Sequence, residues 1–287
     1  MQRRQFLQAG PAFVLGSSIL RAAPKWAKVP IGLELYSVRE DFMKDMPGTL
    51  KVVAQAGYQG VEMWGPYADW DAAKAKEFTK MVHDLGMKVF STHTGYKYFA
   101  PEYLNQVADL NGIMETRFMV MSSAGQIKNL DGWKEVAAKL NVAAEKLKPM
   151  GKRTGFHNHA VEFTPLEGKR PIEVLAKETP SSVVLQLDVG TCLAAGSDPI
   201  AWVKANPGRF GSVHLKDWKA GTGDVRTGYH VLFGEGYQNW PALLEAAATK
   251  GSAEHFLIEQ EGGVKHTPYE TIAKCLENYK RMRGDKS

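Results

Sequence analysis

The sequence predicts an α/β protein formed by a single (β/α)8 barrel, the architecture known as the TIM barrel. Short runs of β-branched and apolar residues recur eight times between residues 31 and 261. A longer stretch with helical periodicity follows each run. Alternating strands and helices of this kind indicate a parallel sheet with right-handed crossovers, and 287 residues suffice for one complete barrel.

The expected elements follow from these runs. Strands are expected at residues 31–37, 58–64, 87–93, 116–122, 153–159, 182–188, 211–217 and 255–261. Helices are expected at residues 49–57, 73–86, 101–114, 133–151, 171–178, 198–205, 240–250 and 268–283. Gly57 and Gly86 close the first two helices, at a position where a left-handed residue commonly ends a helix.

A doubly wound open sheet is the competing arrangement. Such sheets usually carry a glycine-rich GxGxxG motif after the first strand, and none follows residue 37. The chain also has no low-complexity linker and no second composition regime. We therefore expect one domain over residues 29–287.

Residues 1–28 differ from the rest of the chain. RRQFL at residues 3–7 precedes a weakly apolar run at residues 9–20, and two alanines follow at 22 and 23. A charged start, a short apolar middle and a small-residue end are typical of an export signal, and the RRxFL order resembles the twin-arginine signal. The apolar run is too short for a permanent membrane span. We expect a periplasmic or exported protein without a stable membrane anchor; a disordered or amphipathic leader is the alternative.

The composition is that of an ordinary globular protein, with 23% charged and 44% hydrophobic residues. Lysines and arginines give a formal net charge of +5 but are spread along the chain. Nucleic-acid binding usually requires a clustered basic stripe, so we expect no nucleic-acid partner and disfavour endonuclease activity. Cys192 and Cys275 show no metal-ligand spacing and could pair or stay free.

Ionisable side chains gather at the carboxyl ends of the expected strands, where barrel enzymes carry their active sites. Charges that face an apolar core are costly, so their coincidence indicates a metal ion or a polar substrate. The residues concerned are Glu34, Arg39, Glu62, His93, His157, His159, Glu162, Asp188, His214, Lys216, Glu259 and Glu261.

Three of these residues lie on consecutive strands. Asp188, His214 and Glu259 belong to the sixth, seventh and eighth expected strands, and we expect a fourth donor from the fifth. A mixed oxygen and nitrogen set suits Mn²⁺, Zn²⁺, Co²⁺ or Mg²⁺. A divalent metal cation is therefore the expected cofactor, and the choice among the four ions stays open.

Beyond single residues, the chain resembles the sugar phosphate isomerase/epimerase superfamily, which has a xylose isomerase-like TIM barrel. The resemblance covers about residues 30–283 and rests on a series of motifs in order. They are IGLELYSVR (31–39), GVEMW (60–64), FHNHAVEF (156–163), QLDVGT (186–191), SVHLKDW (212–218), LFGEGYQNW (232–240) and FLIEQE (256–261). HLKD, GEGxxxW and HNHxxEF are fairly specific together, although each alone would be weak.

The resemblance implies a divalent cation held by a glutamate, an aspartate, a histidine and a second glutamate from strands five to eight. Asp188, His214 and Glu259 match the last three roles. On the fifth strand HNH stands in place of the glutamate, so either Glu162 folds back to the metal or a histidine replaces it. We expect Glu162 to be the ligand.

The resemblance further implies an isomerase or epimerase that acts on a small keto-sugar. In such enzymes a carboxylate removes a proton next to a carbonyl, and the metal stabilises the resulting enediolate. Glu162 and Glu259 are the expected acid/base pair. The expected substrate contacts are His157, His159, His93, Lys216, Glu62, Arg39, Trp64 and Trp218.

Two alternatives stay open. One is a lyase or dehydratase of the keto-inositol or 3-keto-glycoside type. The other is a periplasmic sugar-binding barrel that has lost its chemistry, which the presence of both candidate proton carriers disfavours. The sequence does not indicate an oligomeric state.

Overall fold

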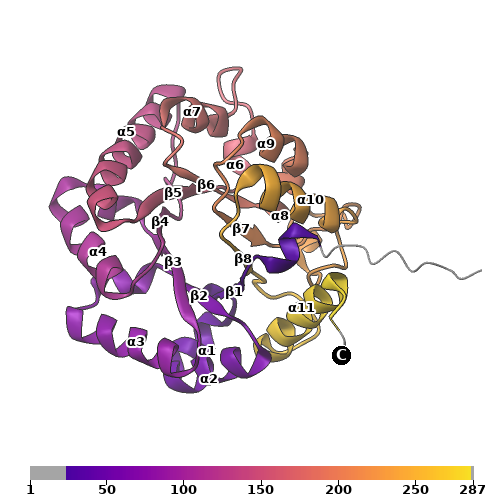
Figure 1. Ribbon diagram of the computed structural model, residues 1–287. Coiled ribbons are helices and arrows are strands. Elements are labelled where there is room, and N and C mark those ends of the chain that lie inside the picture. The colour runs from indigo at the N-terminus through magenta and orange to yellow at the C-terminus, as the bar shows by residue number, and fades with distance from the viewer. Residues whose placement is uncertain (1–23, 286–287) are drawn as a thin grey trace, which may run out of the picture.

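The computed structural model describes residues 24–285, and within them eight parallel strands close into a barrel (Figure 1). The strands pair in chain order, and the last pairs with the first. They are β1 (Ile31–Glu34), β2 (Gly60–Met63), β3 (Lys88–Thr94), β4 (Phe118–Met121), β5 (Arg153–His157), β6 (Val184–Asp188), β7 (Ser212–Leu215) and β8 (His255–Ile258). The prediction of a single (β/α)8 barrel is confirmed.

Helices form a ring outside the strands (Figure 1). They are α1 (Arg39–Lys44), α2 (Met46–Ala56), α3 (Ala72–Asp84), α4 (Pro101–Ile113), α5 (Leu130–Leu147), α6 (Ala160–Phe163), α7 (Pro171–Glu178), α8 (Val189–Ala194), α9 (Pro199–Ala205), α10 (Trp240–Ala246) and α11 (Pro268–Arg283). A π-helical turn, Ala247–Gly251, continues α10. Several of the helices begin at a residue whose side chain accepts a hydrogen bond from a backbone N–H of the first turn. These residues are Asp45, Asp71, Asn129 and Thr267.

Some strands are shorter than the sequence predicts. β1 ends at Glu34, three residues before the expected end, because Leu35–Val38 turns at once into a 3-10 helix. The short helix α8 follows β6 directly, and two residues separate α6 from the end of β5; the sequence did not predict either helix. These abrupt turns place the last residues of the strands at the rim of the barrel, where they can line a site.

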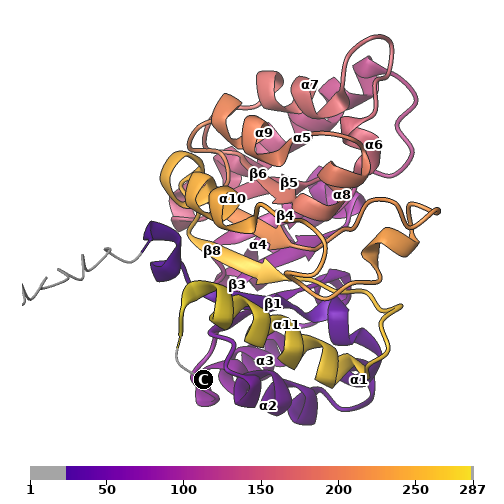
Figure 2. The same ribbon diagram turned by 90° about the vertical axis from the view of Figure 1, so that its right-hand side faces the viewer.

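Aromatic rings pack against one another inside the barrel below that rim, among them the half-buried Phe90 and the buried His255. The rings of Phe90 and His255 stack with centroids 4.8 Å apart. A Cβ atom at Gly32 or Gly60 would lie within 3.0 Å of the Phe90 ring, so both positions require glycine. In the side view the strand arrows point to one side of the molecule, and the loop after β7 projects from that side (Figure 2).

Part of the expected leader belongs to the folded body. Lys25–Lys28 forms a 3-10 turn, and Trp26, 3% exposed, packs edge-on against Tyr279 with ring centroids 5.6 Å apart. The rest of the expected export signal, residues 1–23, lies outside the described residues. None of the helices between residues 24 and 285 is long and apolar enough to cross a bilayer.

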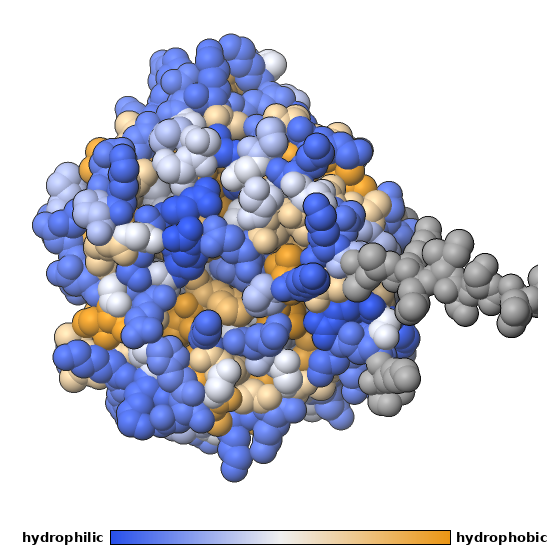
Figure 3. Space-filling view, viewed as in Figure 1, coloured by the Kyte–Doolittle hydropathy of each residue, from blue (hydrophilic) through white to orange (hydrophobic). Residues whose placement is uncertain are grey.

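The surface and the cysteines are ordinary for a globular protein. The face seen along the barrel axis is mostly hydrophilic, with apolar residues in small patches (Figure 3). Cys192 and Cys275 are both buried and both free among the described residues. The pairing that the sequence left open therefore does not form here.

Candidate metal centre and active site

Four side chains from β5 to β8 converge at the carboxyl end of the barrel. His157, Asp188, His214 and Glu259 each present a donor atom, and these atoms lie within 4.8 Å of one another. All four residues are at most 6% exposed. His157 Nε2 is 3.8 Å from Asp188 Oδ2, and His214 Nδ1 is 2.6 Å from Glu259 Oε2. This group is the candidate metal centre.

Asp188 has one carboxylate oxygen in use and one free. Its Oδ1 accepts a hydrogen bond of 2.8 Å from Thr191 N, which caps α8. Its Oδ2 is buried and has no hydrogen-bond partner within residues 24–285. Burial raises the pKa of Asp188 to about 6, although nearby Lys216 opposes this shift. A buried oxygen without a partner is costly, so this atom fits the role of a cation ligand.

Gln186 fixes the protonation of His157. The Gln186 amide nitrogen donates to Glu62 Oε2 and to Ser212 Oγ, both at 2.8 Å, so its carbonyl oxygen faces the histidine. His157 Nδ1 therefore donates to Gln186 Oε1 at 2.9 Å. Burial holds the pKa of His157 well below its usual value. The neutral ring keeps a lone pair on Nε2, the atom nearest Asp188.

Glu62 holds His214 from the side opposite the cavity. His214 Nε2 donates to Glu62 Oε1 at 2.6 Å, while Nδ1 faces Glu259. Burial alone would lower the pKa of His214, but Glu62 and Glu259 raise it to about 10. A carboxylate behind a histidine is a common way to orient a metal ligand. A cation at Nδ1 would replace the proton there.

Glu62 also belongs to a second group of possible metal donors, with Glu34, His93 and His214, but hydrogen bonds engage both of its oxygens. Its oxygens accept hydrogen bonds from His214, Ser91 and Gln186, and Oε1 lies 3.1 Å from His93 Nε2. The three hydrogen bonds engage both oxygens and leave at most one lone pair, on Oε1, for a further donor. Burial would raise the pKa of Glu62, but His93 and His214 hold it well below its usual value. Glu62 is therefore a buried anion that supports the site, and it does not line the cavity.

The donor set of the candidate centre fits a divalent cation. Two imidazole nitrogens and two carboxylates are ligands that such ions accept in proteins. Lys216 lies beside the same carboxylates, with Nζ 3.3 Å from Glu259 Oε1 and 3.9 Å from Asp188 Oδ2. It also pairs with Glu261. The Lys216 ammonium group thus places a positive charge beside the carboxylates of Glu259 and Asp188.

A cavity of about 970 Å³ opens above the centre. Its walls combine polar groups with the rings of Tyr36 and Trp64, which meet edge-on with centroids 6.4 Å apart. The other lining residues include Glu34, His93, Ser122, Ser123, His157, His159, Lys216, Arg226, Tyr229, His230, Glu259 and Glu261. This polar and aromatic lining suits a small molecule rich in hydroxyl groups.

The loop after β7 supplies one wall of this cavity and is held by a single carboxylate. Asp217 accepts hydrogen bonds from the backbone nitrogens of Trp218, Gly234, Gly236 and Tyr237 at 2.7 to 3.1 Å. Trp240 Nε1 donates to the same side chain at 3.1 Å. These contacts gather the GEGxxxW motif around Asp217 and so fix the base of the loop that carries Tyr229.

Three residues that the sequence singled out lie away from the candidate centre. Glu162 is 1% exposed and outside the group of donors; its Oε2 accepts a hydrogen bond of 2.7 Å from His159 N at the start of α6. Trp218 Nε1 donates to Val225 O at 3.1 Å, and its ring fills the space beside Gly228. Arg39 donates from Nη1 to Tyr36 O at 3.0 Å and stacks on the Tyr36 ring.

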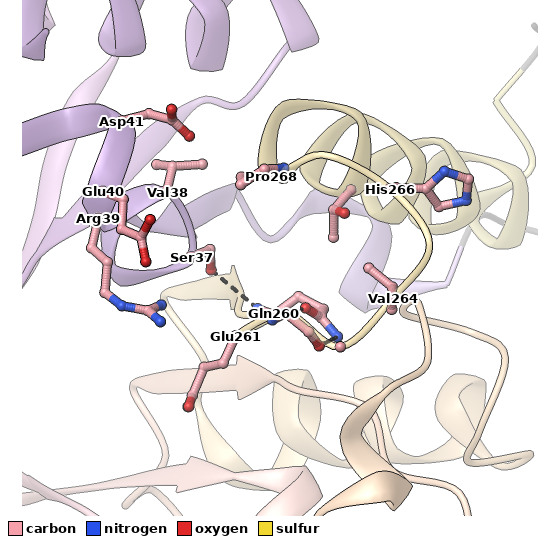
Figure 4. A pocket seen from close by; sticks show the side chains of 13 residues that line it. Ser37, Val38, Arg39, Glu40, Asp41, Gln260, Glu261, Val264, His266 and Pro268 are labelled. Atoms are coloured by element: carbon pink, nitrogen blue, oxygen red, sulfur yellow. Dashed lines mark hydrogen bonds between the residues drawn. The ribbon is translucent and has the colours of Figure 1, made fainter. Parts of the chain in front are cut away.

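Arg39 lines a second, smaller cavity of about 180 Å³, which Figure 4 shows between the loops after β1 and β8. Arg39, Glu40 and Asp41 lie on one side of it, and Val264 and His266 lie on the other. Of the remaining predicted contacts, His93, His157, His159, Lys216 and Trp64 line the large cavity.

Two functional positions were missed from the sequence because their side chains do not ionise near neutral pH. Gln186 sets the orientation of His157, and Tyr229 lies under the Lys216 ammonium, 5.3 Å from Nζ to the ring centroid. Gln186 could have been found from strand alternation, since it stands two residues before Asp188 and therefore faces the same side. Tyr229 lies in a loop, where no periodicity points to it.

The fold and the cluster define a (β/α)8 barrel protein with a candidate divalent-metal site at the carboxyl end of its strands. The chain belongs to the xylose isomerase-like TIM barrel family, whose model matches residues 50–279. No curated protein matches the chain.

Solved structures with the same fold include two proteins named as isomerases or epimerases and one with a bound zinc atom. A sugar phosphate isomerase/epimerase from Parabacteroides distasonis is 26% identical with a TM-score of 0.74, over 91% of this chain and 94% of that one. D-psicose 3-epimerase, solved in the presence of D-fructose, is 11% identical with a TM-score of 0.63, over 84% and 94%. The IolI protein, solved with a bound zinc atom, is 14% identical with a TM-score of 0.67, over 89% and 98%.

Proposed function

We propose that this protein is a divalent-metal-dependent isomerase or epimerase of small keto-sugars. The observation that carries the proposal is Asp188 Oδ2, which has no hydrogen-bond partner within residues 24–285 and lies 3.8 Å from His157 Nε2, beneath a cavity suited to a molecule with hydroxyl groups. Family membership supports it, as do the isomerase and epimerase names of two structural neighbours.

The cation would be held by His157, Asp188, His214 and Glu259. When bound, a divalent cation supplies Lewis-acid polarisation of a substrate carbonyl. Two imidazole ligands favour Mn²⁺, Zn²⁺ or Co²⁺ over Mg²⁺, which prefers an all-oxygen shell. His157 takes the place on β5 that the sequence reading gave to Glu162, because its Nε2 and not the Glu162 carboxylate belongs to the group of converging donors.

Glu259 is the residue best placed to remove a proton next to the polarised carbonyl. It lines the cavity at the end of β8. Burial would raise its pKa, but Lys216 and His214 hold the pKa well below its usual value, so the carboxylate is ionised and accepts a proton. Lys216, 3.3 Å away, can hold a substrate oxygen close to this base.

His159 is the proposed second proton carrier, on the β5 side of the cavity. Desolvation at the cavity wall lowers its pKa to about 4, so the ring is neutral and able to accept a proton at neutral pH. To invert the carbon, Glu259 would keep the proton that it removes, and a different proton, taken up from solvent by His159, would be delivered from this side. To isomerise the sugar, Glu259 would return its own proton to the neighbouring carbon, while the hydroxyl proton passes to the former carbonyl oxygen.

Deuterium exchange tests the proposal. Metal-loaded protein is incubated with D-fructose in D₂O, and deuterium at the carbons beside the carbonyl is measured by NMR. We expect exchange by the wild type and by Glu162→Gln, and its loss in Glu259→Gln with metal content retained in part. Loss of exchange in Glu162→Gln at full metal content would restore Glu162 as the acid/base residue.

Incubation of the same metal-loaded protein with a 3-keto-glycoside, followed by product analysis, separates the main alternatives. Release of an aglycone or an alkene from a 3-keto-glycoside, without exchange in D-fructose, would replace the isomerase by a lyase. Saccharide binding without any turnover would indicate a binding protein.

We also propose export by the twin-arginine route, based on RRQFL at residues 3–7. Export that survives replacement of Arg3 and Arg4 by lysine would contradict this part of the proposal.

A further inference from the structure

The large cavity offers more space than a single keto-sugar fills. Its volume is about 970 Å³, and pockets of roughly 300–1,000 Å³ enclose whole drug-sized ligands. A single hexose is much smaller than such a ligand. A keto-sugar whose carbonyl lies at the candidate metal centre therefore occupies only part of the cavity, and the rest is available to a further part of the substrate.

Two aromatic rings lie on the other side of the barrel mouth from the first two metal ligands. The eight strands pair in chain order around a closed barrel, so β1 and β2 stand opposite β5 and β6. His157 and Asp188 end β5 and β6. Tyr36 stands two residues after the end of β1, and Trp64 follows β2 directly. Both rings line the cavity.

Tyr36 and Trp64 form an aromatic corner, with ring planes at 75° and centroids 6.4 Å apart. Phe42, 3% exposed, packs edge-on against Trp64 with centroids 5.1 Å apart. The Arg39 guanidinium covers one face of the Tyr36 ring, 4.3 Å from its centroid. Arg39 lines the small cavity and Tyr36 the large one, which leaves the opposite face of the ring for the large cavity. The corner is thus held in place before any ligand binds.

The chemistry of this region suits a second sugar ring. Both rings of the aromatic corner are half-buried, and aromatic faces pack well against the C–H groups of a carbohydrate. Ser122 and Ser123, which follow β4 in the same wall, add hydroxyl groups that favour a sugar over an aromatic substituent. We propose that the aromatic corner is a second sugar subsite and that the substrate is a keto-disaccharide. Its carbonyl-bearing unit would lie at the metal centre. This inference rests on the proposed function and adds to it the size of the substrate.

The second ring should raise the affinity only while the aromatic corner is intact. We expect at least one disaccharide in which glucose or galactose is attached to D-fructose to bind the wild type about 10- to 100-fold more tightly than D-fructose does. In Trp64→Ala the ratio of the two dissociation constants should fall to within about twofold of one. Tyr36→Leu, which leaves the indole in place, should lower the ratio by about threefold.

Calorimetry with Mn²⁺-loaded protein measures the dissociation constants of D-fructose, turanose, lactulose, leucrose and isomaltulose. These disaccharides carry the second sugar on different hydroxyl groups of fructose and keep its carbonyl free. Tyr103→Ala is the matched control and should keep the wild-type ratio. Tyr103 is 41% exposed on α4, packs edge-on against Tyr98 with centroids 5.9 Å apart, and lies outside the group of residues that line the cavity. Thermal unfolding and metal content are recorded for each variant. If Trp64→Ala does not fold because it loses the contact with Phe42, Tyr36→Leu serves as the test.

Two results would overturn this inference and leave the proposed function standing. One is deuterium exchange in D-fructose by a wild type that binds no keto-disaccharide more tightly than D-fructose. The other is an unchanged ratio in a folded variant of the aromatic corner. Equally tight binding of D-fructose that carries a phenyl group in place of the second sugar would overturn the assignment to a sugar, since stacking alone would explain it. Failure of the wild type to bind D-fructose and every disaccharide would remove the proposed function as well, and it appears before any substitution is made.

Discussion

Glu62→Gln removes the negative charge behind His214 and leaves the size of the side chain unchanged. The Glu62 carboxylate accepts a hydrogen bond of 2.6 Å from His214 Nε2. This bond orients the ring, whose Nδ1 faces the candidate metal centre. A glutamine keeps one acceptor oxygen, and its amide nitrogen then faces either the histidines or the donors of Ser91 and Gln186. We expect the variant to fold and to bind divalent metal more weakly.

The size of the loss follows from the type of hydrogen bond that changes. A hydrogen bond to a charged acceptor contributes about 1.5–3 kcal/mol, and a bond between neutral groups contributes about 0.5–1.5 kcal/mol. The difference of about 1–2 kcal/mol corresponds to a roughly 5- to 30-fold higher dissociation constant for the metal. Removing partners of metal-bound histidines typically costs about 10- to 100-fold, which overlaps this range.

Competition with a chromophoric chelator at pH 7.5 measures the dissociation constant for Zn²⁺ and Mn²⁺. Ser212→Ala is the matched control, because it removes a neutral hydrogen bond to Gln186 from the same buried network and leaves the charge behind His214 intact. Thermal unfolding of the metal-free proteins verifies the fold. A dissociation constant for Glu62→Gln within twofold of the wild type would refute the reasoning that this carboxylate orients a metal ligand.

Two further predictions concern pH. Burial raises the pKa of Glu162 from 4.5 to about 7, so the folded protein holds this proton more tightly and loses stability as pH rises through that window. The free energy of unfolding of the wild type should therefore fall between pH 5 and pH 8, and Glu162→Gln should reduce that fall by up to about 3 kcal/mol in urea unfolding. An identical pH dependence in the two proteins would contradict this. Burial lowers the pKa of His255 from 6.5 to about 3, so between these values only the unfolded chain takes up the proton and stability falls as pH drops. His255→Phe should make the acid-induced loss between pH 6 and pH 4 shallower by about 1.4 kcal/mol per pH unit, and an unchanged slope in denaturant titrations would count against it.

The barrel could be predicted because its signal is repeated. Each strand and each long helix carries its own apolar pattern, so an error in one unit does not alter the fold. The boundaries were less accurate where the chain leaves the sheet sharply. Leu35–Val38 is apolar enough to read as a continuation of β1, yet Glu34 accepts the Tyr36 N–H and starts a 3-10 turn. Such local hydrogen bonds override the apolar pattern.

The candidate site could be predicted only where position on a strand determines position in space. Asp188, His214 and Glu259 end consecutive strands, and the structure brings their side chains together. The fifth-strand donor was harder, since FHNHAVEF offers three side chains and the sequence does not say where β5 stops. β5 ends at His157, and Glu162 then serves the start of α6 instead of the centre.

The hydrogen bond from His157 Nδ1 to Gln186 Oε1 restricts how this binding site can change during evolution. A glutamate at position 157 would bring a second acceptor against the Gln186 carbonyl, and the two oxygens would repel. Turning the Gln186 amide over would relieve that repulsion but would withdraw the N–H from Glu62, which supports His214. A lineage that exchanges histidine for glutamate on β5 therefore has to alter β6 as well, and each replacement made alone is penalised.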